Sequence, residues 1–116
     1  MQIRVFKKES IKSGEKENAI SIIQDSAESI NKRLIKELSL KDSDFTISYT
    51  IYGLWIDFTN NDSYGIKVFY DADNNKIIVR SMQDHDTMKQ LELEVMSHPV
   101  RIASNITQII TQDGVI

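Results

Sequence analysis

Alternating apolar and polar positions mark the middle of the chain, in two β-rich runs, Phe45–Thr59 and Tyr64–Met82. Inside the second run, Asn74-Asn75 provides two residues that tolerate the positive φ angles of a two-residue type I′ turn. Such a turn pairs Asp73 with Lys76, Ala72 with Ile77, Tyr70 with Val79 and Val68 with Ser81. The pattern therefore predicts an antiparallel hairpin centred on Asn74-Asn75.

The two faces of this predicted hairpin differ, because successive side chains of a strand point to opposite sides. One face is apolar and comprises Ile66, Val68, Tyr70, Ala72, Ile77 and Val79. The other is mixed and comprises Lys67, Phe69, Asp71, Ile78, Arg80 and Met82. A one-residue slip would exchange the faces, so the split supports the predicted register.

The first run changes phase near Tyr52-Gly53. Its apolar residues are odd-numbered before this point and even-numbered after it: Phe45, Ile47, Tyr49 and Ile51, then Leu54, Ile56 and Phe58. We expect a β-bulge at Gly53 in one long bent strand. A tight turn between two shorter strands is the alternative, which the lack of polar turn residues disfavours. Beyond this point Trp55 and Asp57 share one side, and the loop Asn60–Ser63 returns the chain antiparallel.

The segment from Glu15 to Leu38 has helical periodicity. Its apolar stripe consists of Ile20, Ile23, Ala27, Ile30, Leu34 and Leu38. Ser13 or Gly14 can cap this helix. Additional isoleucines widen the stripe beyond a coiled-coil seam, so packing against the sheet is favoured over a coiled coil.

The C-terminal third is less distinct. Residues 88–96 combine a helical stripe with strand-like alternation, and their good helix formers favour a helix. Pro99 then interrupts the preceding element. A last helix is predicted from Pro99 to Gln112, with Ser97 or His98 as its N-cap and Gly114 as its stop.

At the N-terminus, Gln2–Lys7 is predicted to form a short strand. The resulting order is β-α-β-β-β-α-α. We therefore expect a single α+β domain over residues 1–116, in which an antiparallel sheet of about four strands carries helices in a two-layer arrangement.

Composition narrows the function classes. The chain has 116 residues and a net charge of −3. It has no cysteine, and this absence excludes disulfides and thiolate chemistry. No segment approaches the roughly 20 apolar residues of a membrane helix, and the N-terminus lacks the apolar centre of a signal peptide. We therefore expect a cytoplasmic protein without a membrane partner. Frequent Ile, Lys, Asn and Asp with little Pro and Gly is typical of AT-rich bacterial or phage genomes.

Charge argues against direct nucleic-acid binding, because the chain is acidic and has no long basic run. An acidic surface that imitates DNA is an alternative, with Asp57, Asp62, Asp71 and Asp73 as its carboxylates. At a net charge of −3 the field would be weak.

Chemical motifs are few. The run from Asp71 to Asn75 resembles the start of a calcium loop, but the required glycine and bidentate glutamate are replaced by Lys76 and Met82. The four glycines are isolated, so no phosphate-binding loop exists. We therefore expect no metal site and no cofactor.

A second hypothesis is a small enzyme or ligand-binding domain that uses Asp84, His85 and His98. Neighbouring residues on a helix do not face one another, so Asp84-His85-Asp86 alone cannot converge on one ligand. Helix capping by an aspartate is the simpler explanation.

The mixed sheet face is the feature that suggests a function. Aromatic residues, methionine and arginine are enriched at the centres of protein interfaces. Three elements could pack on this face: the C-terminal helices, a second copy of the chain, or a different protein. We expect a non-enzymatic protein-binding module of the adaptor, immunity, chaperone or inhibitor type, with Trp55, Phe69, Arg80 and Met82 as the partner-binding residues.

Overall fold

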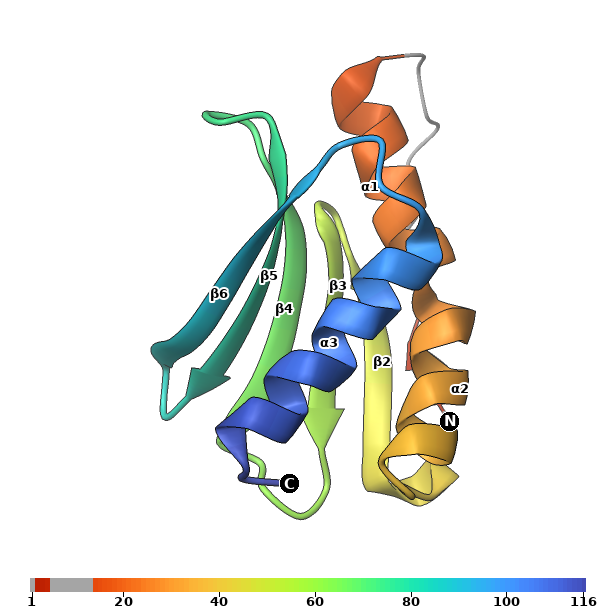
Figure 1. The fold of residues 1–116 in the computed structure, drawn as a ribbon, viewed down its shortest axis with the longest axis vertical. Helices are drawn as coiled ribbons and strands as arrows, with labels where there is room; N and C mark the ends of the chain where they lie inside the picture. Colours follow the sequence, from red (N-terminus) through yellow and green to blue (C-terminus); the bar gives the residue numbers. More distant parts are fainter. Residues whose placement is uncertain (1, 5–13) are drawn as a thin grey trace.

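A twisted sheet with helices on one side forms the fold, in a computed structural model that describes residues 2–4 and 14–116 (Figure 1). Within these residues the sheet has six strands in the order β1-β2-β3-β4-β5-β6. The helical elements are α1 (Glu15–Asp25), α2 (Ala27–Glu37), the short 3₁₀ helix η1 (Asp42–Asp44) and α3 (Pro99–Asp113). The predicted α+β architecture, with an N-terminal and a C-terminal helical part on a largely antiparallel sheet, is confirmed.

The strands follow the chain from one edge of the sheet to the other. They are β1 (Gln2–Arg4), β2 (Phe45–Thr50), β3 (Gly53–Phe58), β4 (Tyr64–Asp71), β5 (Lys76–Gln83) and β6 (Asp86–Glu94). All neighbouring strands are antiparallel except β1 and β2. A parallel pair needs a crossover connection, which α1 and α2 provide. The second half of the predicted strand Gln2–Lys7 lies outside the described residues.

The predicted helix from Glu15 to Leu38 is present as two helices that meet at Ser26. The hydroxyl of Ser26 donates to the carbonyl of Ile23 at 2.5 Å, and its N–H is shared between the carbonyls of Ile22 and Ile23. This side-chain bond to the preceding turn is a known cause of helix bending. The expected packing on the sheet is confirmed, since α1 contacts β3 and β4.

The bulge expected at Gly53 is wrong, and the alternative of a tight turn is correct. Ile51 and Tyr52 form the turn between β2 and β3, which pairs Thr50 with Gly53. An antiparallel hairpin with this register places odd-numbered residues of β2 beside even-numbered residues of β3, so Ile47 lies opposite Ile56. Gly53 is needed because an added Cβ would collide with the carbonyl group of Val68 on β4.

The hairpin of β4 and β5 exists, but its predicted register is wrong by two residues. Asp71 pairs with Lys76 and Val68 with Val79, so residues 72–75 form a four-residue loop. The Asp71 carboxylate stabilises this loop by accepting the N–H of Asp73 (3.1 Å) and the side-chain amide of Asn74 (2.9 Å). A shift of two residues preserves the faces, so the apolar and mixed faces of the strands are as predicted.

The helix predicted for residues 88–96 is wrong, because this segment forms most of β6. Leu91 pairs with Val79 and Leu93 with Ile77, so the apolar residues of β6 extend the core side of the sheet. Pairing with β5 outweighs the helix propensity of the segment. The residues expected to cap that helix instead form a two-residue turn, in which Asp84 and His85 have φ angles of 53° and 71°.

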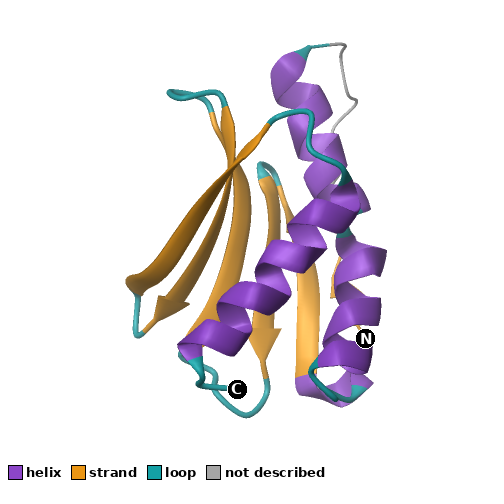
Figure 2. Cartoon of the chain, viewed as in Figure 1, coloured by secondary structure: helices purple, strands orange, loops and turns teal. Residues whose placement is uncertain are grey.

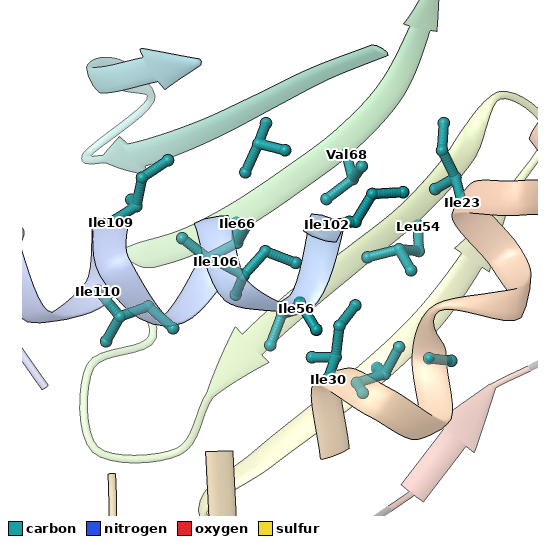
Figure 3. Close-up of a cluster of buried hydrophobic side chains, with 14 of the residues drawn as sticks. Ile23, Ile30, Leu54, Ile56, Ile66, Val68, Ile102, Ile106, Ile109 and Ile110 are labelled. Carbon is teal, nitrogen blue, oxygen red and sulfur yellow. The ribbon is translucent and has the colours of Figure 1, made fainter. Parts of the chain in front are cut away.

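The last predicted helix is confirmed as α3. Its N-cap is His98, whose Nδ1 accepts the N–H of Val100 at 3.1 Å, and its C-cap is Gly114 in the left-handed conformation (φ 67°). In α3, Ile102, Ile106, Ile109 and Ile110 are buried and face the strands (Figure 3). These side chains form one core cluster with apolar residues of α1, α2 and the sheet. No α-helix in the described part of the chain is long and apolar enough to cross a membrane.

Candidate protein-binding face

All the described α-helices lie on the same side of the sheet. The helices α1 and α3 contact the strands, α2 packs against α3, and their buried side chains join one cluster with the apolar sheet face (Figure 2). The opposite side, called here the open face, has no described helix over it. It carries Thr46, Ser48, Thr50, Trp55, Asp57, Lys67, Phe69, Asp71, Lys76, Ile78, Arg80, Met82, Gln90, Glu92 and Glu94.

One cross-strand row forms the centre of the open face. Trp55 on β3 pairs with Lys67 on β4, which pairs with Arg80 on β5, which pairs with Gln90 on β6. Directly opposite residues of antiparallel strands have Cα atoms only about 4.5–5.5 Å apart. The row therefore places two cations side by side, an arrangement that destabilises a sheet unless something compensates it.

Phe69 provides part of that compensation. The Lys67 ammonium lies 4.7 Å from the centroid of the Phe69 ring, and the Arg80 guanidinium carbon lies 5.0 Å from it. Both positions are within the range of cation–π attraction. Arg80 also donates from Nε to Oε1 of Gln90 at 2.8 Å. Within the described residues neither cation has a carboxylate at salt-bridge distance.

The indole of Trp55 lies against the backbone of the neighbouring strand. An added Cβ on Gly65 would come within 2.6 Å of Cη2 and 2.9 Å of Cε2 of this ring. Gly65 therefore leaves the space in which the indole packs on β4. The indole N–H donates to the Asp57 carboxylate at 2.5 Å, which fixes the orientation of a ring that remains partly exposed.

Two aliphatic side chains complete the surface. Ile78 is only 2% exposed although it is not part of the core cluster beneath the helices. Its cross-strand neighbours are Phe69 and Glu92. Met82 lies opposite Gly65 and is partly buried. The open face thus has an apolar layer of its own, with Lys67, Asp57 and Glu92 exposed around it.

The four residues predicted to bind a partner lie on one face. Trp55 and Arg80 belong to the central row, Phe69 contacts Arg80, and Met82 lies on β5 two residues beyond Arg80. The C-terminal helix α3 is not the cover of this face, because it packs on the other side. Sequence reasoning missed Gln90 and Glu92, since it assigned their segment to a helix. The signal that could have found them is the alternation from Leu91 to Val95.

The histidines of the alternative catalytic hypothesis do not form one site. His85 directly precedes β6, whereas His98 follows its end. A nine-residue strand is about 30 Å long at roughly 3.3 Å per residue, so the two imidazoles lie at opposite ends of the sheet. His98 is engaged as a helix cap. Among the described residues, no group of His, Asp and Glu could hold a metal ion.

The carboxylates of the DNA-mimic hypothesis are also dispersed. Asp73 lies in the loop between β4 and β5, whereas Asp62 lies in the loop at the other end of β4. Asp71 is engaged in its own loop, and Asp57 accepts from Trp55. This arrangement lacks the dense acidic surface that strong electrostatic capture requires.

The helix side offers a shallow groove between α2 and α3. It has a volume of about 430 Å³ and is lined by Glu37, Leu38, Ser104, Thr107, Gln108, Thr111 and Gln112. Glu37 is paired with Arg33 at 3.2 Å. The groove has neither a cluster of titratable groups nor a deep apolar pocket, so the open face is the stronger candidate.

A partly buried hydrogen bond joins the sheet to the end of α3. The Tyr64 hydroxyl donates to the Asp113 carboxylate at 2.6 Å. Burial, together with this hydrogen bond to a carboxylate, raises the pKa of Tyr64 well above its usual range. Tyr64 is 1% exposed, so the pair supports the packing of α3 rather than an exposed reaction centre.

Comparisons with protein-family models, with curated protein sequences and with solved structures find no match for this chain. Its function therefore has to be inferred from the geometry of its own residues.

Proposed function

We propose that this protein is a small non-enzymatic protein-binding module that recognises its partner with the open face of the sheet. The observation that carries the proposal is the position of the helices. They cover one face and leave Trp55, Phe69, Arg80 and Met82 together on the other. The role is of the adaptor, immunity, chaperone or inhibitor kind, and a cytoplasmic location fits such a role.

The composition of the open face supports this proposal. Tryptophan, phenylalanine, methionine and arginine are the residue types enriched at interface centres, and exposed charges typically form the rim. Gly65 and Asp57 hold Trp55 in one orientation, and two cations hold the ring of Phe69. Anchors that are ordered before binding lose less conformational entropy when the complex forms.

Capture from a lysate of the source organism tests the proposal. Immobilised wild type is compared with a Trp55→Ala/Phe69→Ala double variant and with a matched control, Ile35→Ala/Val100→Ala. The control removes two exposed apolar side chains from α2 and α3 instead. We expect proteins that the wild type and the control retain and the open-face variant loses. Equal capture by all three would refute the proposal, provided circular dichroism shows that each variant is folded.

Light scattering separates a second copy from a different partner. If the wild type is a dimer and Trp55→Ala is a monomer, the open face serves self-association. A monomer in both cases leaves the open face available to a different protein.

A further inference from the structure

The centre of the open face holds two positive charges, and neither has a carboxylate of the described residues at salt-bridge distance. Lys67 and Arg80 are directly opposite each other on β4 and β5, and both lie against the ring of Phe69. A further cation of the open face, Lys76, is paired with Glu94 at 2.6 Å. The side-chain partner of Arg80 across β5 and β6 is the neutral amide of Gln90. An adjacent like-charge pair lowers the stability of a sheet.

We infer that Lys67 and Arg80 bind carboxylates of an acidic segment in the partner protein. This inference rests on the proposed function, the open face being a protein-binding surface. A carboxylate over this pair would relieve the repulsion between the cations and accept hydrogen bonds from both. Hydrogen bonds between ionised groups are stronger than those between neutral groups, and an arginine guanidinium matches a carboxylate in shape.

The residues around the two cations also indicate which apolar groups the partner segment carries. Phe69 lies beneath them, Trp55 adjoins Lys67, and Ile78 adjoins Phe69. These apolar groups remove water from a bound carboxylate, which strengthens its attraction to the cations. The matching segment therefore alternates acidic and apolar side chains, as an extended strand or one helix face does.

A second copy of the chain fits this centre less well. In a two-fold contact whose axis passes between Lys67 and Arg80, each cation would face a cation of the other copy. Such a contact adds repulsion where the protein already has an excess of positive charge. Charge complementarity thus favours a different, acidic partner.

A single-stranded nucleic acid also fits less well. The ring of Phe69 already contacts both cations, which restricts its use as a stacking surface. Asp57 holds the edge of Trp55, and Glu92 lies beside Ile78. The indole N–H of Trp55 donates to Asp57, so this edge of the ring is not available to hydrogen-bond a base.

The test uses a synthetic peptide of alternating glutamate and leucine and a matched peptide with glutamine in place of glutamate. Trp55 is the only tryptophan in the chain, so its fluorescence reports binding at the open face. We expect the glutamate peptide to bind at least about tenfold more tightly than the glutamine peptide, and to weaken as salt is added. Equal binding of both peptides, or preferential binding of an oligouridine, would overturn the inference.

Variants assign the effect to the two cations. Lys67→Gln/Arg80→Gln removes both, and Lys32→Gln/Lys36→Gln changes the net charge equally at exposed positions of α2. The first variant should lose preference for the glutamate peptide and the second should retain it. The opposite pattern would contradict the assignment.

Lys67→Glu separates loss of binding from loss of stability. It places a carboxylate opposite Arg80 and thus supplies within the protein the charge that we assign to the partner. We expect its melting temperature to rise above that of the wild type while binding of the glutamate peptide is lost. Retained binding would overturn the inference. Lysate capture that needs Trp55 and Phe69 but survives loss of both cations would overturn the inference and leave the proposed function standing.

Discussion

Replacing Gly65 with alanine should move Trp55 without unfolding the protein. The new Cβ would lie 2.6 Å from Cη2 and 2.9 Å from Cε2 of the indole, well inside the 3.4 Å at which ordinary van der Waals contact begins. These atoms are at the far end of a side chain on a face without a described helix, so the ring can lift away. Overpacking of this kind costs about 1–3 kcal/mol. The reduced entropy of the unfolded chain returns about 0.5–1 kcal/mol.

We therefore expect Gly65→Ala to lower the free energy of unfolding by about 1–2 kcal/mol. The displaced ring loses its contact with β4 and its hydrogen bond to Asp57, so the fluorescence maximum and near-ultraviolet circular dichroism of Trp55 should change. Urea titration measures the stability, and the two spectra measure the position of the ring. Binding through the open face should weaken as well.

Gly53→Ala is the matched control on the neighbouring strand. There the added Cβ would meet the backbone carbonyl of Val68, which cannot move without breaking the pairing of β3 with β4. Its stability loss should exceed that of Gly65→Ala. Unchanged Trp55 spectra in a folded Gly65→Ala protein would refute the packing of the indole on Gly65.

Three further predictions concern the fold. Folded Tyr64 keeps its proton at pH values where the unfolded chain has lost it, so the stability that Tyr64 contributes should be complete below pH 10.0 and fall above it. Burial also raises the pKa of Tyr49, so Tyr64→Phe should reduce this alkaline decline in urea titrations without removing all of it, and an equal decline would contradict the assigned hydrogen bond. His85→Gly relieves a positive φ of 71° and should raise the free energy of unfolding by about 0.5–1 kcal/mol. A lower free energy of unfolding would contradict the positive φ of His85 in the turn between β5 and β6. Ile106→Ala empties a fully buried position and should cost about 2–5 kcal/mol, and a cost below 1 kcal/mol would refute its core position.

The mixed face was predictable from local alternation. Lys67, Phe69, Arg80 and Met82 were assigned to one side of their strands because a side-chain period of two divides any strand into two faces. The predicted register was wrong by two residues, yet the faces were right. A displacement of an even number of residues leaves every side chain on its own side.

The last strand was not predictable in the same way. Residues 88–96 contain good helix formers, and only their pairing with β5 makes them a strand. The turn at Asp84-His85 likewise depends on two non-glycine residues with positive φ. Its sequence is equally suited to capping a helix.

The sequence by itself determined which segments have an apolar face, where α3 starts and stops, and which side chains share a face of β4 and β5. Those properties depend on neighbours along the chain. Only the tertiary structure decided that the described α-helices lie on one side of the sheet, that Trp55 rests on Gly65, and that Lys67 stands opposite Arg80. These properties depend on contacts between distant segments, whose relative positions are set by packing of the whole core rather than by local pattern.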